Sequence, residues 1–452
     1  MSLVPIILPL LASAQDLQSF YNAAMENDPQ WLAAKHALEA ARQRPGMAQS
    51  ALWPQLSFAA TRHEQTGSLH YAEEDPVHKD VQARNRELRL TQGLIRPEQW
   101  AAVRQANAQE AQALAQYDVA RQQLAIRLAQ AYLDAWVAQE SVHLTAAQLK
   151  AYEGQLALAR DNYQVGTTTI SDVHEAQAQR DLGQAQVISA ALELQRHATE
   201  LRRMTGRTPA TLHGVREDAP SPTVDLEPLS IWLDRAVQLR PEVLVAQAGV
   251  HVADREQDRR RSSFLPTLDL AIARGTDRSS GSVTAPTDTA YRNRITRTTL
   301  TLNWPLFEGG RSYYQMREAA AAVEQAEAEL DLARGEAGAI VRQAYAGLVS
   351  GRAQIRALLS ARTSSLKALE ASQVGYRIGT RINLDVLNAQ SQYANVQRDL
   401  VRARAEVVLH WLRLQAAAGR LGPESMARVN AWLDITGSPV DLNDISIDLD
   451  TP

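Results

Sequence analysis

Residues 299–310 read TLTLNWPLFEGG and contain a change of secondary structure. Apolar and polar side chains alternate up to Trp304, which is the period of a β-strand with one apolar face. Proline and glycine then interrupt the pattern, and a long segment without proline begins at Gly310. The stretch therefore predicts a strand that returns to a long helix at Gly309 and Gly310.

The same sequence of features occurs twice, since sliding the chain on itself by about 212 residues brings landmarks into register. Matches over nearly 150 residues with a single slip indicate a tandem duplication. The matched pairs are Asp28-Pro29 with Arg240-Pro241, Trp53-Pro54-Gln55-Leu56 with Leu265-Pro266-Thr267-Leu268, and Gly93-Leu94 with Pro305-Leu306; one residue further on, Gln130-Ala131-Tyr132 match Gln343-Ala344-Tyr345, Val165-Gly166-Thr167 match Ile378-Gly379-Thr380, and Asp172-Val173 match Asp385-Val386.

Each half carries two strand-like segments, near 55–66 and 84–95, and near 267–277 and 292–304. One face is apolar and the other polar, a pattern typical of a membrane barrel with a wet interior, or of a small soluble sheet with one buried face. Four strands cannot close around a channel, so either the sheet stays open or several chains share one barrel. Pro54 and Pro266 begin the strand pairs, and Pro97 and Gly309-Gly310 mark the return to helix.

Very long helices are predicted at 98–165 and 310–376, each followed by a second helix, at 170–206 and 383–419. Neither long segment contains proline after its first residues, and at 1.5 Å per residue each would span roughly 100 Å. A heptad seam rich in alanine runs along the second, which permits close helix packing; a plain coiled-coil protein is the alternative. Its positions are Met316, Ala319, Val323, Ala326, Leu330, Ala333, Ala337, Ile340 and Ala344.

Composition narrows the class of protein. Aromatic residues are only 5% of the 452 residues, and four phenylalanines are few for a large globular core. A net charge of −4 argues against nucleic acid as a partner. The absence of cysteine excludes disulfides and thiolate chemistry, and it suits an oxidising envelope compartment.

The chain divides into segments of different character. Residues 1–14 combine an apolar run with Ala12-Ser13-Ala14, which predicts a signal peptide or its remnant, although a basic start is missing. Residues 16–206 and 230–421 are the two repeats, 207–229 form a polar connector expected on the outside, and 422–452 form a tail. No later stretch reaches the ~18 consecutive apolar residues of a membrane-spanning helix.

Two motifs resemble those of the TolC family of outer-membrane efflux and secretion proteins. They are residues 303–310, NWPLFEGG, and above all residues 375–390, GYRIGTRINLDVLNAQ. The resemblance extends over about residues 16–425 and implies an α+β membrane protein. Three chains would each give four strands to a twelve-stranded outer-membrane barrel and long antiparallel helices to a periplasmic tunnel. The expected location is the outer membrane of a Gram-negative bacterium, in contact with its lipid.

The resemblance also implies a periplasmic gate, held by contacts near the turns between long and short helices. The corresponding residues are Gln155, Ser171, Asp172, Tyr376 and Arg381. Arg381 can form charge-assisted hydrogen bonds to Asp172 or Ser171 of a neighbouring helix, and the phenol of Tyr376 can bond Gln155. Alternatively, Ser171 and Asp172 only cap the helix that follows them.

Asp385 is expected at the constriction, where threefold symmetry would form a ring of three carboxylates that selects cations. The family often has a second acid one turn later, but this chain has Asn388 there. A weaker negative constriction follows, with weaker block by multivalent cations.

No enzyme is predicted, because neither an H-E-x-x-H motif nor a P-loop is present and the ten histidines are scattered. His174 is the one histidine near the expected gate, and it fits a solvated helix position. No catalytic, cofactor or metal residues are assigned. The resemblance implies a periplasmic adaptor and an inner-membrane ABC transporter as partners, hence type I protein secretion. The alternatives are small-molecule efflux with a proton-driven pump and a periplasmic coiled-coil tether.

Overall fold

The structure is a computed structural model that describes residues 16–70, 75–209, 212–216, 226–284 and 289–433. The predicted signal segment 1–14 and parts of the connector and tail lie outside these residues. The chain forms two compact units, each assembled from pieces of both halves. The first comprises Met1–His36, Gln116–Leu244 and Leu332–Pro452, and the second comprises Ala37–Ala115 and Val245–Asp331.

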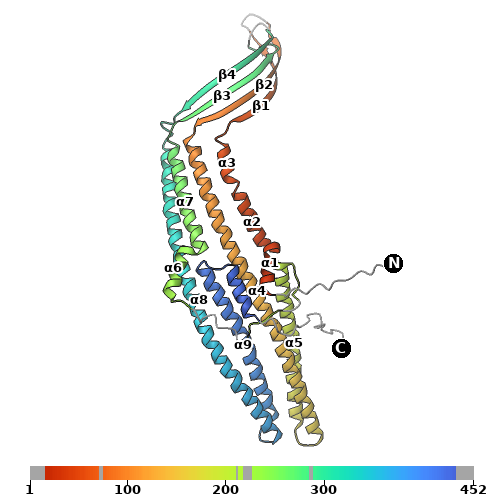
Figure 1. The fold of residues 1–452 in the computed structure, drawn as a ribbon. Helices are drawn as coiled ribbons and strands as arrows, with labels where there is room; N and C mark the ends of the chain where they lie inside the picture. The colour runs from red at the N-terminus through yellow and green to blue at the C-terminus, as the bar shows by residue number, and fades with distance from the viewer. Residues whose placement is uncertain (1–15, 71–74, 210–211, 217–225, 285–288, 434–452) are drawn as a thin grey trace, which may run out of the picture. The chain divides into compact units, whose positions relative to one another are not determined.

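The second unit contains one antiparallel sheet with strand order β1-β2-β3-β4 (Figure 1). Each hairpin belongs to one half of the chain, and pairing of β2 with β3 joins the halves. The second strand begins at Val77, well before the predicted start near residue 84, because it pairs with β1 as far as Leu69. The strands are β1 (Gln55–Leu69), β2 (Val77–Ile95), β3 (Thr267–Ser279) and β4 (Tyr291–Asn303).

One face of this sheet is apolar at the end next to the helices. Leu56 pairs with Leu90, and Phe58 pairs with Leu88. Direct partners in an antiparallel pair point to the same side, so these apolar side chains form one surface. Leu56 and Phe58 are 67% and 68% exposed, and the burial of this surface must therefore come from outside the single chain.

Prolines and left-handed glycines mark the passages between helix and strand. Pro54 directly precedes β1, Pro266 precedes β3, and Pro97 is the first residue of α4. Gly309 and Gly310 have φ of 64° and 85°, a region that favours glycine, and α8 begins at the next residue. The helices of these passages are α2 (Pro29–Ala41), α3 (Arg44–Ser50), α7 (Pro241–Ser262), α4 (Pro97–Gln164) and α8 (Arg311–Arg377).

No helix among the described residues is long and apolar enough to cross a membrane.

The first unit is helical, and its core joins segments that lie far apart in the sequence. The Phe20 ring meets Tyr132 edge-on at 5.8 Å, and the Tyr132 hydroxyl donates to the carbonyl oxygen of His213 in the connector at 3.1 Å. Burying a large side chain of this kind stabilises the fold by about 1.5–3 kcal/mol. The remaining helices are α1 (Leu17–Asn27), α5 (Ile170–Thr205), α6 (Leu229–Leu239), α9 (Asn383–Ala417) and α10 (Pro423–Trp432).

Helix α10 lies within the segment 422–452 that was expected as a tail. Trp432 packs edge-on against Trp411 of α9 at 4.8 Å. Asn430 donates a hydrogen bond to Asp16 at 2.8 Å, which ties α10 to the start of α1. A buried aromatic pair is enough to hold this short helix against the core.

Candidate functional site

All predicted gate residues except Gln155 lie where two helical hairpins turn, α4 to α5 and α8 to α9. The turns have the same backbone geometry. Gly166 and Gly379 have φ of 79° and 76°. The amide of each glycine donates to the carbonyl oxygen three residues earlier, that of Tyr163 at 3.0 Å and that of Tyr376 at 3.1 Å. The left-handed residue ends each long helix and satisfies its last carbonyls. Both turns belong to the first compact unit.

At the first hairpin tip, defined as residues 162–175, Asp172 forms a complete cap for α5. Its carboxylate accepts from the Thr169 amide at 3.1 Å and the Thr169 hydroxyl at 2.9 Å, and also from the Thr168 hydroxyl. The Thr169 hydroxyl accepts in return from the Asp172 amide at 3.3 Å. The hydrogen bond from Thr168, and then those from Thr169, hold the pKa of Asp172 below its ordinary value. Within the single chain Asp172 therefore acts as a capping residue.

At the second hairpin tip, defined as residues 375–388, the equivalent acid is less well satisfied. Asp385 accepts a long hydrogen bond of 3.4 Å from the Ile382 amide, and Ile382 has no hydroxyl to answer it. Arg381 lies 3.7 Å from the Asp385 carboxylate, and both side chains are more than one-third exposed. An exposed pair at this distance contributes little, so Arg381 and Asp385 keep most of their capacity for other partners.

The tip of α8 contacts α4 through Tyr376, whose hydroxyl accepts from the Asn162 side chain at 3.3 Å. The predicted partner Gln155 lies further up α4, and its Oε1 is buried without a partner among the described residues. Arg381 reaches neither Asp172 nor Ser171 in any hydrogen bond or ion pair of the described part of the chain. Ser171, His174 and Asn388 are exposed. The latch contacts are therefore not formed within one chain. They remain predicted contacts between neighbouring chains.

A residue that sequence reasoning missed lies beside Asp385. Asn383, the first residue of α9, is 1% exposed, and neither atom of its amide has a partner among the described residues. Leu387, four residues further along α9, packs into a core cluster with Tyr152 and Leu156 of α4. An unsatisfied buried amide costs about 1–3 kcal/mol. Its signal in the sequence was a polar residue at a helix start, which is ordinarily read as exposed.

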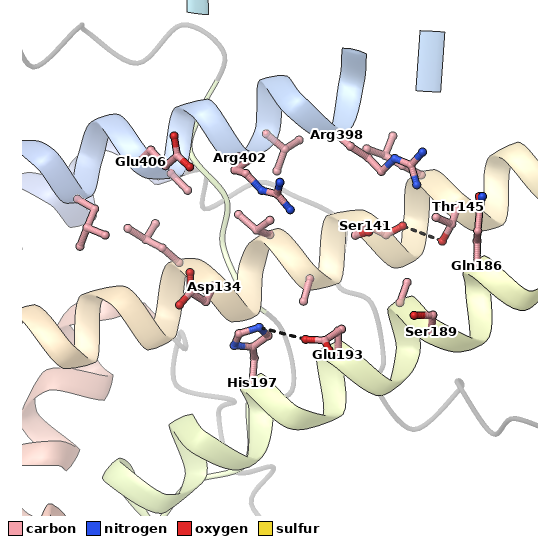
Figure 2. A pocket seen from close by; sticks show the side chains of 18 residues that line it. Asp134, Ser141, Thr145, Gln186, Ser189, Glu193, His197, Arg398, Arg402 and Glu406 are labelled. Atoms are coloured by element: carbon pink, nitrogen blue, oxygen red, sulfur yellow. Dashed lines mark hydrogen bonds and ion pairs between the residues drawn. The ribbon is translucent and has the colours of Figure 1, made fainter. Parts of the chain in front are cut away.

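Further along the same helices a cavity of about 450 Å³ lies among α4, α5 and α9 (Figure 2). Asp134, Glu193 and His197 line one side, and Arg398 and Arg402 come from α9. Burial raises the pKa of Asp134, and the charges of His197 and nearby arginines oppose this rise. His197 lies 3.7 Å from Glu193. The cavity is a mixed-charge space between helices.

The cavity and both tips lack a recognisable reaction centre. No group of three or more potential metal ligands occurs among the residues that the structure describes. His197 is contacted by Arg196 and Glu193, and in the described part of the chain no hydroxyl is bonded to it. The arrangement of the tips suits contacts between helices, which can form or break as helices move.

Comparison with known proteins decides the class. The family described as outer membrane efflux protein matches residues 20–207 and 232–420, one segment in each half. The chain belongs to this family. Proteases secretion protein PrtF of Dickeya chrysanthemi is 28% identical over 430 residues, covering 93% of this chain and 92% of the relative. Outer membrane protein TolC of Vibrio cholerae is 28% identical, covering 93% of this chain and 94% of its own length.

Solved structures agree on the fold. The outer membrane protein VceC from Vibrio cholerae superposes with a TM-score of 0.72 at 21% identity, over 90% of this chain and 97% of that one. The resemblance to the TolC family and the predicted fold class, a helical tunnel plus strands that complete a barrel, are thereby confirmed. The protein is an outer-membrane exit duct of a Gram-negative bacterium with a periplasmic helical extension. Its family is one of channels rather than of enzymes.

Proposed function

We propose that three copies of this chain form the exit duct of a type I protein secretion system, together with a periplasmic adaptor and an inner-membrane ABC transporter. The observation that carries the proposal is the similarity to PrtF, a proteases secretion protein, along 93% of the chain. The sheet adds support for the trimer, since β1 and β4 are edges and carry exposed apolar side chains. Open edges of this kind pair with further strands.

The second hairpin tip is the proposed gate. Arg381 and Tyr376 hold the closed state through bonds to neighbouring helices, with Gln155, Ser171 and Asp172 as the acceptors and donors, and Asp385 forms the constriction ring next to Asn388. The weak pairing of Arg381 with Asp385 at 3.7 Å supports this assignment, because an exposed guanidinium is free to bond elsewhere. Charge-assisted hydrogen bonds are worth about 1.5–3 kcal/mol each, so a docking adaptor can break them.

Deletion of the gene in its own host tests the function. Loss of one or more proteins from the culture medium, restored by a plasmid copy, is the expected result. Unchanged secretion together with increased sensitivity to drugs would instead indicate small-molecule efflux, the alternative in which a proton-driven pump is the inner-membrane partner. A detergent-independent soluble monomer would indicate a periplasmic tether and would sink both channel proposals.

A further inference from the structure

Four arginines form a row across all strands of the sheet. Arg62 pairs directly with Arg84, Arg84 with Arg278, and Arg278 with Arg292. Direct partners of an antiparallel pair share a face, with Cβ atoms about 4.5–5.5 Å apart. Four positive charges therefore stand side by side at one level on one face.

This row lies on the apolar face of the sheet. It is separated from the helices by the apolar band, defined as Leu56, Phe58, Leu88 and Leu90. Arg62 is four residues beyond Phe58 along β1, and because side chains alternate with a period of two they share a face. Three more arginines fill the rows between: Thr276 is paired with Arg86 on one side and Arg294 on the other, and Arg274 is paired with Leu88. The arginine surface is Arg62, Arg84, Arg86, Arg274, Arg278, Arg292 and Arg294.

The charge of the arginine surface is largely uncompensated by the chain. Among the described residues only Arg62 of these seven has an acidic partner, Glu64. Two acids share the arginine face, Glu64 beside Arg62 and Asp80 four residues before Arg84 in β2. The next acids lie on the other face, where Glu87 pairs with Arg89 at 2.9 Å and Asp277 accepts from Tyr291 at 3.2 Å. Like charges directly opposite each other destabilise a sheet. A sheet built with this row therefore fits an anion supplied from outside the chain.

The position of the row points to the kind of anion. At the end next to the helices, the exposed Trp53 precedes β1 and the exposed Trp304 directly follows β4. Outer-membrane barrels usually have aromatic residues at both borders of the band, but here arginines stand at the border remote from the periplasmic helices. Arginine can lay its stem along apolar surface and carry the guanidinium to the headgroup level.

We propose that the arginine surface binds phosphate groups of anionic lipid headgroups in the outer leaflet. The proposal rests on the outer-membrane placement of the channel and not on what the channel exports. A guanidinium bonds phosphate with two parallel hydrogen bonds, which a lysine cannot reproduce. A hollow of about 440 Å³ lies on the surface, lined by Phe58 and Leu88 as well as four of the arginines, so it offers apolar contact and charge together.

Lipid titration of the purified full-length channel in zwitterionic detergent tests this assignment. The probes are lipid A bearing two phosphates, phosphatidylcholine and inorganic phosphate, with binding followed by native mass spectrometry. Arg278→Gln with Arg292→Gln should weaken lipid A binding about tenfold. The matched control is Arg89→Gln with Arg297→Gln, which removes two charges from the opposite face of the same sheet. It should leave lipid A binding unchanged.

Thermal unfolding gives a second readout, in which the variant that binds lipid A more weakly is expected to be the more stable one when lipid is absent. Without lipid, Arg278→Gln with Arg292→Gln should melt above the wild type, because two directly opposed charges are gone. Lipid A should raise the melting points of the wild type and of the control by similar amounts, and that of the test variant by less. Equal loss in the control, undiminished binding in the test variant, or equal binding of phosphatidylcholine would overturn the proposal. Displacement of lipid A by inorganic phosphate at matching concentrations would overturn the lipid assignment. Secretion is not measured in either assay, so failure here leaves the proposed function standing.

Discussion

The two hairpin tips share one backbone and differ in what their side chains do. Gly166 and Gly379 end the long helices in the same left-handed conformation. After this point the first tip places Thr169 before its helix, and the second places Ile382 there. A hydroxyl completes the cap of α5, whereas the isoleucine leaves the cap of α9 half formed.

The difference continues one residue later, where the exposed Ile170 at the start of α5 corresponds to the buried Asn383 at the start of α9. The first tip is thus satisfied within itself, and the second contains an unsatisfied amide and a weakly paired charge. A group without a partner in one state stabilises another state only if it gains a partner there. The comparison assigns movement to the second tip and makes the capped first tip, with Ser171 and Asp172, the fixed partner that it bonds in the closed state.

The largest expected effect is on conductance. Arg381→Ser combined with Tyr376→Phe should raise the open fraction in planar bilayers about tenfold, because losing 1.4 kcal/mol shifts an equilibrium by that factor. Tyr163→Phe, the equivalent change at the first tip, should leave conductance at the wild-type level. Unaltered conductance in the double variant would remove the latch assignment.

Ion selectivity should separate the two equivalent acids. Asp385→Ala should lower the preference for cations about twofold or more, since a ring of carboxylates attracts cations. Asp172→Ala should leave the preference unchanged, because Asp172 is not part of the proposed constriction ring. Reversal potentials in a salt gradient measure both, and Asn388→Asp should strengthen block by multivalent cations. An unchanged preference in Asp385→Ala contradicts the ring.

Stability should respond to the two helix starts in different ways. Asn383→Leu should stabilise the solubilised channel by about 1–3 kcal/mol, since it removes an unsatisfied buried amide. Ile170→Leu, the control at the exposed equivalent position, should change stability by less than about 0.5 kcal/mol. Thermal unfolding is the measurement. Destabilisation by Asn383→Leu would show that the amide has a partner in the assembled channel.

The caps can be exchanged between the tips. Ile382→Thr should stabilise α9 by about 1 kcal/mol, and Thr169→Ile should destabilise α5 by a similar amount, because each change adds or removes one capping hydroxyl. Hydrogen exchange of the first amides of each helix reports the effect locally. Equal protection in the wild type and both variants would mean that the hydroxyl is not what distinguishes the tips.

The smallest effect concerns pH. The folded pKa of Asp172 is lowered by its hydrogen bonds, so its stabilisation is fully present above the unfolded value of about 3.9 and is lost as the pH falls through the lower folded value. Protection of the α5 start should therefore decrease in that acidic window in the wild type. In Asp172→Asn the same decrease should be absent. An identical decrease in both proteins would assign it to another group.

Much of the fold follows from local pattern. Alternation with a period of two marked the strand pairs, and proline with glycine marked where helices begin and end. The missed features depend on pairing partners distant in sequence. The start of β2 at Val77 follows its partner in β1, and α10 is held by Trp411, which lies in another helix. Local sequence carries no information about such partners.

In the candidate site, too, some features follow from sequence motifs and others only from tertiary contacts. Motif positions identified Asp172, Asp385 and Arg381, but not which of the two acids is occupied. That depends on hydroxyls a few residues away and on side-chain rotamers, which are fixed only in the folded structure. The sequence likewise did not reveal that Asn383 is buried, since burial depends on segments distant in the sequence that pack around the start of α9.

By itself the sequence determined the duplication, the order of helices and strands and the turn at each tip, because these depend on period and on residues with restricted backbones. Tertiary structure decided the register that aligns Arg62, Arg84, Arg278 and Arg292, and it decided which tip is satisfied. Strand register and burial are properties of pairs of segments. They arise from contacts over long sequence separations, which no local pattern can specify.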